Sequence, residues 1–151
     1  MREVARKARQ EFVNEITSMG GTMPYLLLIL LGLALGHTGE AAILALGYAL
    51  TLSIVIGIKI FYFKPRPEPI AYRSFYGKMW ASSFPSLHAM RTFMLAMLLG
   101  TWSGSWKAHA ILLVLASLVA WSRVKLGKHD WVDVTAGGAM GIIVGLALRP
   151  L

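Results

Sequence analysis

Cysteine is absent from this 151-residue sequence, and acidic residues are few, with 7 Asp and Glu against 15 Lys and Arg. The absence of thiols excludes disulfides, thiolate metal sites and cysteine catalysis. Polar residues are also few, because 56% of the chain is hydrophobic, which is more than a soluble domain of this size carries. The composition therefore indicates one membrane-embedded domain.

The shortage of acidic residues leaves a net charge of +8. In a soluble protein such a charge would favour a nucleic-acid partner. Here the basic residues lie between apolar runs, so the expected partners are membrane lipids and phosphate-bearing substrates, with no nucleic acid. No cleavable signal peptide is expected, because residues 1–20 are charged and amphipathic.

Five apolar runs are each expected to cross the membrane as a helix. A span needs about 20 residues to cross roughly 30 Å of hydrocarbon, and the first run is short for that task. The expected spans are Met23–Gly36, Glu40–Phe63, Pro85–Thr101, Lys107–Leu126 and Asp130–Leu148. The predicted fold class is therefore all-α, a polytopic transmembrane helical bundle in a single domain over residues 1–151, with its transmembrane core at 23–150.

Residues 1–20 are expected to form an amphipathic helix that lies in the membrane interface. Apolar Val4, Phe12 and Ile16 recur at helical spacing, with Arg6 and Arg9 between them. A basic helix with one apolar face is typical of such interfacial segments. A solvated basic tail is the alternative.

Five spans would place the N-terminus and the loops at 64–84 and 127–130 on one face of the membrane. Most basic residues outside the motifs described below belong to that face: Arg2, Arg6, Lys7, Arg9, Lys64, Arg73, Lys78, Lys125 and Lys128, against Lys107 and Arg149 opposite. The positive-inside rule then predicts a multi-pass protein of the cell membrane with this face in the cytoplasm. That orientation assumes that residues 1–20 do not cross the membrane.

Polar and ionisable side chains gather where four of the spans meet this face. They are Lys59 and Arg66, then Ser86, His88 and Arg91, then Ser122 and Arg123, and finally His129 and Asp133. An ionisable group at membrane depth is a functional candidate by default, because hydrocarbon solvates charge poorly. Their convergence on one level predicts an active site at the membrane edge.

The spacing of these residues suggests their chemistry. His129 and Asp133 are four apart and would share one face of a helix. The carboxylate could accept the proton of one imidazole nitrogen and leave the other free to attack. His88 follows Pro85 at a helix start, where free N–H groups favour an anion.

Cationic donors complete this arrangement. Lys59, Arg66 and Arg123 could hold phosphate oxygens, with Arg binding two at once. Two imidazoles in a cationic cradle indicate phosphoryl transfer through a phosphohistidine. One imidazole would attack phosphorus and the other would protonate the leaving oxygen, while the cations stabilise the developing charge.

Three motifs in this region resemble those of the type-2 phosphatidic acid phosphatase family, whose active site is shared with the vanadium haloperoxidases. "KIFYFKPRP" at 59–67 matches the family pattern KxxxxxxRP throughout. "PSLH" at 85–88 matches PSGH except at its third position. "SRVKLGKHDWVD" at 122–133 matches SRxxxxxHxxxD throughout. The three motifs together, in order, are far more specific than any one of them.

The resemblance implies a role for each matched residue. His129 would be the nucleophile, Asp133 the carboxylate that orients it, and His88 the general acid for the leaving group. Phosphate binding would fall to Lys59, Arg66, Ser86, Leu87 and Arg123. Arg91 is a possible further substrate contact. The resemblance implies no metal and no cofactor, and places the lipid tail among the helices.

Leu87 is the departure from the family pattern, since it stands where the motif has glycine. A glycine there can let the backbone approach phosphate closely. Leu87 retains an N–H that can still contact an oxyanion if its φ is negative. The substitution bears on the size of the pocket and on the rate, and leaves the reaction class unchanged.

The expected function is an integral membrane lipid phosphatase, a metal-independent histidine phosphatase. Its substrate would be an isoprenoid (di)phosphate, a phosphatidate or a phosphatidylglycerol phosphate. One alternative is a lipid phosphotransferase with the same site. Another is a catalytically silent lipid-phosphate-binding protein, for which Leu87 is the support. A soluble haloperoxidase is disfavoured by the hydrophobicity.

Several of these features also have plainer interpretations. His88 alone would fit an interfacial histidine, and Lys59 a lysine that extends to the headgroups. The other motifs favour the functional interpretation of both. The loop at 70–83 either caps the site or simply lies in the interface. The glycines at 137, 141 and 145 predict close helix packing.

Overall fold

A computed structural model describes residues 2–149, except for the side chains of Arg2 and Ala5. The described chain is all-α, as predicted, with seven helices: α1 (Arg2–Ser18), α2 (Thr22–Ala34), α3 (Thr38–Phe61), α4 (Phe75–Ala81), α5 (Leu87–Trp102), α6 (Trp106–Lys125) and α7 (Trp131–Leu148). The side chain of Arg2, counted above among the basic residues, and residue 150, the predicted end of the core, lie outside the described part.

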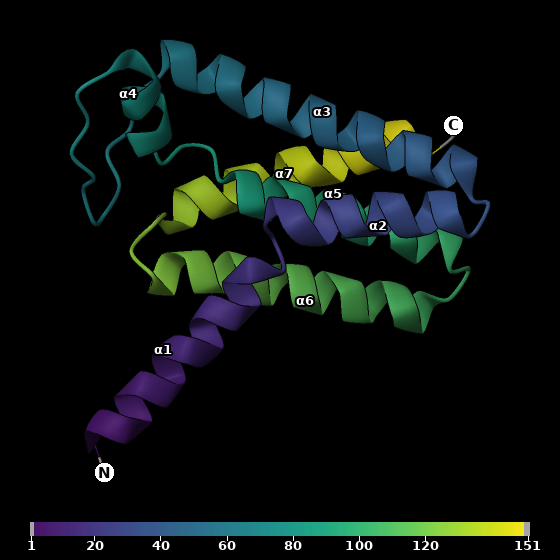
Figure 1. The fold of residues 1–151 in the computed structure, drawn as a ribbon, viewed down its shortest axis with the longest axis horizontal. Helices are drawn as coiled ribbons and strands as arrows, with labels where there is room; N and C mark the ends of the chain where they lie inside the picture. The colour runs from purple at the N-terminus through teal and green to yellow at the C-terminus, as the bar shows by residue number, and fades with distance from the viewer. Residues whose placement is uncertain (1, 150–151) are drawn as a thin grey trace.

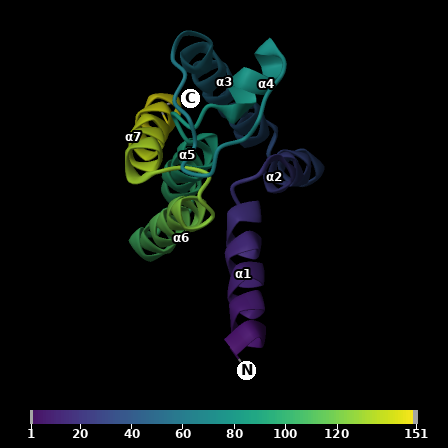
Figure 2. The same ribbon diagram turned by 90° about the vertical axis from the view of Figure 1, so that its left-hand side faces the viewer.

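The bundle consists of α2, α3, α5, α6 and α7, which run side by side, and α1 projects from it at an angle (Figure 1). Seen along the bundle, α5 lies between α7, α6, α3 and α2 (Figure 2). It packs most extensively against α7 and α6, and Met90, Met94 and Leu98 on α5 are completely buried. Each of the five predicted spans corresponds to one helix of this bundle.

Helix length decides which of these helices can cross a membrane alone. α3, α6 and α7 are long and apolar enough. α1 and α2 together make a fourth candidate, which is broken by a bend of 44°. α5 has 16 residues and α2 has 13, or about 24 and 20 Å of helix. The chain is thus a polytopic helical membrane protein with three to four candidate spans.

Small residues hold α7 against α5. A Cβ atom on Gly141 would lie 2.1 Å from the carbonyl oxygen of Met90, and one on Gly137 would lie 2.5 Å from that of Ser86. The backbone N–H of Ser86 also donates a 3.0 Å hydrogen bond to the carbonyl of Asp133. The predicted close packing of this glycine series is confirmed, and it joins the second and third motifs.

The N-terminal segment is helical, as predicted, and α1 contacts α6 before the chain bends. Val4 and Phe12 on α1 are 72% and 57% exposed, respectively. The helix therefore leaves an apolar face uncovered by the rest of the protein. Its location in the membrane interface stays a prediction.

Three local predictions are wrong. The loop at 70–83 contains a short helix, α4, whose N-cap Ser74 accepts a 3.0 Å hydrogen bond from the N–H of Gly77. Pro85 lies before α5 rather than in its first turn, because the N-cap is Ser86. His129 precedes α7 rather than lying on it, because Asp130 caps that helix.

Candidate active site

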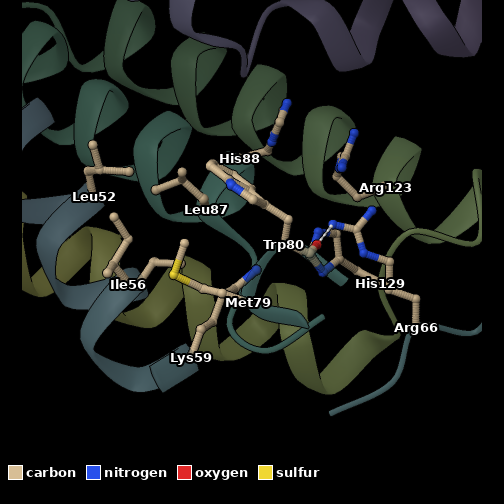
Figure 3. Close-up of a pocket in the computed structure, with 11 residues that line it drawn as sticks. Leu52, Ile56, Lys59, Arg66, Met79, Trp80, Leu87, His88, Arg123 and His129 are labelled. Carbon is tan, nitrogen blue, oxygen red and sulfur yellow. Dashed lines mark hydrogen bonds between the residues drawn. The ribbon is translucent and has the colours of Figure 1, made fainter. Parts of the chain in front are cut away.

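The motif-bearing helix ends meet at one end of the bundle, around a cavity of about 80 Å³ (Figure 3). Its polar wall comes from the end of α3, the following loop, the start of α5, the end of α6 and the α6–α7 connection. Six residues with predicted roles line it: Lys59, Arg66, Leu87, His88, Arg123 and His129. Leu52, Val55 and Ile56 on α3 and Met79 and Trp80 on α4 form the rest of the wall.

His129 and Asp133 face each other but are not hydrogen-bonded. Nδ1 of His129 lies 3.7 Å from Oδ2 of Asp133, and both side chains are buried. Nδ1 has no hydrogen-bond partner among the described residues. The carboxylate nevertheless lies on the Nδ1 side of the ring, so Nε2 is the nitrogen left for chemistry.

Asp133 is held by groups other than the histidine. Oδ2 accepts a 2.9 Å hydrogen bond from the N–H of Asp130, while Oδ1 of Asp130 accepts one of 3.0 Å from the N–H of Asp133. This reciprocal pair is a capping box at the start of α7. Asp130 was not among the residues predicted for the site, although an Asp three residues before another Asp is the pattern that predicts such a cap.

Lys64 is the other residue that the sequence analysis did not place in the site. Its ammonium donates a 2.8 Å hydrogen bond to Oδ1 of Asp133 and another to Asp130. Partial burial opposes its charge, but these two hydrogen bonds outweigh that cost and raise the pKa of Lys64. Lys64 lies within the first motif, between Lys59 and Arg66, and that position was the available signal.

His129 is neutral at ordinary pH. Burial and the nearby cations Arg123, Lys59 and Arg66 lower its pKa to about 2. A neutral imidazole has a free lone pair on one ring nitrogen, which a nucleophile requires. The same cations that would bind a phosphate thus keep this histidine unprotonated.

Two backbone carbonyls, one in α4 and one just after it, position the cations of the first motif. Nζ of Lys59 donates a 2.7 Å hydrogen bond to the carbonyl of Ser82, and Nη2 of Arg66 donates one of 2.7 Å to that of Trp80. The N–H of Ser83 in turn donates a 2.8 Å hydrogen bond to the carbonyl of Lys64. The loop after α3 and the segment before α5 therefore hold each other in place.

Two guanidinium groups in this cavity keep donors without an acceptor. Nε of Arg66 and Nε of Arg123 are buried and have no hydrogen-bond partner among the described residues. Among the described residues, neither side chain forms an ion pair with a carboxylate. Such donors can bind the oxygens of a phosphate, for which Arg geometry is well suited.

Ser86 and Leu87 lie at the N-terminus of α5, beside His88. The side chain of Ser86 is completely buried and caps the helix through the N–H of Ala89, so it does not line the cavity. Leu87 lines the cavity, and no residue other than glycine has a positive φ in the described chain. The negative φ that an oxyanion contact requires is therefore present at Leu87.

Arg91 is not brought to the cavity. It is 3% exposed, its guanidinium lies 4.1 Å from the ring centre of Tyr48, and Nη1 donates a 3.3 Å hydrogen bond to Oγ1 of Thr22. Arg91 thus points towards α2 and α3, one helical turn along α5 from His88. Its contacts join helices and do not reach the residues predicted to bind phosphate.

Comparison with known proteins identifies relatives of this chain. A model of the PAP2 superfamily matches residues 40–151. YbjG of Escherichia coli K12, which is named for undecaprenyl-diphosphatase activity, is 35% identical over 100 residues, or 66% of this chain and 50% of YbjG. A Drosophila melanogaster protein named for phosphatidate phosphatase activity is 39% identical over 77 residues, or 44% of this chain and 20% of that protein. The chain spans about half the length of YbjG, and less of the fly protein.

Two crystal structures have a similar fold. LpxE of Aquifex aeolicus has a TM-score of 0.80 at 25% identity and covers 95% of this chain and 87% of its own. A transmembrane PAP2-type phosphatidylglycerolphosphate phosphatase from Bacillus subtilis has a TM-score of 0.80 at 23% identity, with coverage of 93% and 75%. The second similarity concerns the fold alone. The bundle described above is therefore shared with proteins of known structure, one of which is a transmembrane protein.

Proposed function

The chain belongs to the PAP2 superfamily, and from that membership we propose that it is an integral membrane lipid phosphatase. The observation that carries the proposal is the cavity in which both motif histidines and three motif cations meet. The residues are those of a phosphohistidine mechanism, and their positions permit it.

In the first step, Nε2 of His129 attacks phosphorus. The bond between phosphorus and the lipid oxygen breaks as His88 gives its proton to that oxygen. Lys59, Arg66 and Arg123 hold the other phosphate oxygens and stabilise the charge that develops on them. Asp133, on the Nδ1 side of the ring, favours the positive charge that the attacking imidazole acquires.

In the second step, water replaces the histidine at phosphorus. His88 has lost its proton and accepts one from the attacking water. The bond between phosphorus and Nε2 breaks, and inorganic phosphate and free His129 are formed. The backbone N–H of Leu87 is a further donor for the oxyanion, since it lies at the N-terminus of α5.

The substrate class follows from the two kinds of wall in the cavity. Cations lie at the bundle end, and apolar Leu52, Val55 and Ile56 continue along α3. A phosphate attached to a hydrocarbon tail fits both surfaces. We propose an isoprenoid (di)phosphate, a phosphatidate or a phosphatidylglycerol phosphate, bound at the cytoplasmic face of a five-span bundle.

The test is phosphate release by the detergent-purified protein with EDTA present. The substrates are a diacyl phosphatidate, a phosphatidylglycerol phosphate and an isoprenyl diphosphate of C15 or longer, each also given to His129→Ala. We expect release by the wild-type protein and none by the variant. Equal release by both proteins would contradict the assigned nucleophile.

Leu87 in place of the motif glycine supports one competing function, a lipid-phosphate-binding protein without turnover. That function predicts tight binding of lipid phosphate and no release from any substrate. A phosphotransferase would instead pass the phosphate to an added alcohol, which analysis of the products would reveal. Release as inorganic phosphate, with alcohol present, favours the phosphatase.

A further inference from the structure

The connection between α1 and α2, taken here with the adjoining residues of both helices as residues 17–22, contacts His88, Arg91 and Ser122. We propose that this connection positions His88 for protonation of the leaving group, and that Gly20 is its central residue. The inference rests on the proposed function, because it assigns a role in that reaction. Three separate contacts carry it.

The first contact places Gly20 directly on the imidazole. Gly20 is buried, and a Cβ atom built on it would lie 3.1 Å from Cδ2 of His88, 3.2 Å from Cβ of His88 and 2.8 Å from Cγ1 of Val119. The φ of Gly20 is not positive, so the glycine is needed for space rather than for backbone freedom. Its backbone forms one wall of the slot that holds the ring.

The second contact ties the connection to the third motif. The hydroxyls of Thr17 and Ser122 lie 2.6 Å apart and share a hydrogen bond, and Ser122 is completely buried. Ser122 immediately precedes Arg123, one of the cations in the cavity. The end of α1 is therefore fixed relative to the phosphate-binding end of α6.

The third contact ties the connection to α5. Nη1 of Arg91 donates its hydrogen bond to Oγ1 of Thr22, the first residue of α2, while Tyr48 packs on the guanidinium. Arg91 and His88 are three residues apart on the same helix, so they lie on neighbouring positions of one face. This gives the buried Arg91 a function, which is to hold the connection against the helix that carries the general acid.

The connection also lies outside the segment that the superfamily model matches. The superfamily model matches residues 40–151, whereas Thr17, Gly20 and Thr22 precede it. The motifs thus supply the reacting groups, and a segment before them supplies one wall around His88. Gly20 acts through His88 and is a positioning residue.

The test compares two leaving groups, because only one of them needs a proton. The leaving group of an alkyl lipid phosphate is an alkoxide, which depends on a proton from the general acid. The leaving group of an aryl phosphate is a phenolate, which is stable without that proton. General acids contribute about 100- to 10,000-fold. We expect Gly20→Ala to lower kcat/KM, which reports the first step, on a diacyl phosphatidate by at least about tenfold, a part of that range. On p-nitrophenyl phosphate, kcat/KM should change less than about threefold, since the acid contributes little to departure of a phenolate and kcat/KM does not include the later step in which His88 accepts a proton from water.

Matched variants separate positioning from folding. His88→Gln sets the pattern for loss of the acid, and Gly39→Ala is the control, because a Cβ atom there has nothing within 4 Å. Thr17→Val removes the hydroxyl that meets Ser122 and leaves Gly20 intact, so it tests the same connection if Gly20→Ala does not fold. The double variant Gly20→Ala with Val119→Ala removes the clash between the new Cβ atom and Val119. The close approach of that Cβ atom to His88 remains.

Equal losses on both substrates, or no loss on the alkyl phosphate, would overturn the positioning role. Selective loss on the alkyl substrate in Gly20→Ala or Thr17→Val, with the wild-type pattern in Gly39→Ala, supports it. Failure of the proposed function has a different signature, because the wild-type protein would then release phosphate from neither substrate.

Discussion

The ammonium of Lys64 lies 2.8 Å from Oδ1 of Asp133, so a carboxylate expected to serve His129 alone is shared with a cation. Asp133 is completely buried, and a buried carboxylate needs hydrogen-bond donors or a paired cation. Lys64, in the loop after α3, is that cation, and its ammonium also forms an ion pair with Asp130. The carboxylate predicted to orient His129 is thus held by Lys64 and Asp130 without any substrate.

Substitution of Lys64 by Met should therefore affect both stability and turnover. Loss of a charge-assisted hydrogen bond to a buried carboxylate costs about 1.5–3 kcal/mol. We expect a lower thermal midpoint in detergent and a lower kcat for phosphate release. Lys64→Arg should retain part of both properties. Lys107→Met, a change on the opposite end of the bundle, is the control, and equal behaviour of the two Met variants would contradict this role.

The buried, neutral His129 should make the protein less stable in acid. Its pKa is about 2 in the folded protein, mainly because of burial, and about 6.5 when unfolded. Between these values the unfolded chain binds more protons, so stability is complete above about pH 6.5 and falls as the pH is lowered. The slope approaches about 1.4 kcal/mol per pH unit.

The measurement is the thermal midpoint of wild type and His129→Gln between about pH 7 and pH 4.5, a range set by the unfolded pKa. Glutamine does not titrate, so the variant should lose less stability over this range. Parallel curves for the two proteins would show that His129 is not held neutral in the fold.

Leu87 narrows the cavity at the point where the motif has glycine. We expect Leu87→Gly to favour substrates whose leaving group is bulky near the phosphate. The acyl ester on the carbon next to the phosphate-bearing CH2 makes phosphatidate the bulkier substrate there, so the ratio of kcat/KM for phosphatidate over phosphatidylglycerol phosphate should rise by about tenfold, a typical value for relief of a steric misfit in a pocket. An unchanged ratio would mean that the leaving group does not pass Leu87, and Leu52→Ala on the α3 wall is the comparison.

The seam between α5 and α7 should tolerate no side chain at Gly141. The added Cβ would meet a backbone carbonyl at 2.1 Å, which cannot move without shifting α5. Overpacking of this kind costs about 1–3 kcal/mol or more. Gly141→Ala should lower the thermal midpoint, whereas Gly57→Ala, with nothing within 4 Å, should not. Equal midpoints would contradict the contact.

The motifs could be predicted from sequence because each is a short pattern at a helix end. The helices were predictable for a similar reason, since long apolar runs leave few other structures in lipid. Lys64 was not, because its contact with Asp133 depends on how the proline-containing loop turns back after α3. His129 was expected on a helix because its spacing from Asp133 is helical, but the cap at Asp130 places it just outside.

Arg91 and Gly20 illustrate a second limit. A basic residue one turn from His88 suggested a substrate contact, and only the packing of α2 shows that Arg91 meets Thr22 instead. Gly20 belongs to no pattern, because its importance comes from a close approach to residues some seventy to one hundred positions away in the chain. Contacts between remote segments are set by tertiary packing, which sequence periodicity does not encode.

In the proposed five-span arrangement, α2 crosses the bilayer with 13 residues, about 20 Å, against a hydrocarbon layer of roughly 30 Å. Such a hydrophobic mismatch is relieved by tilting the protein or by thinning the lipid beside it. Thinning on this side would draw the headgroup plane inwards, towards Gly20 and His88. A lipid phosphate would then reach the catalytic level while its tail stayed in hydrocarbon, and thinner membranes would favour the active arrangement.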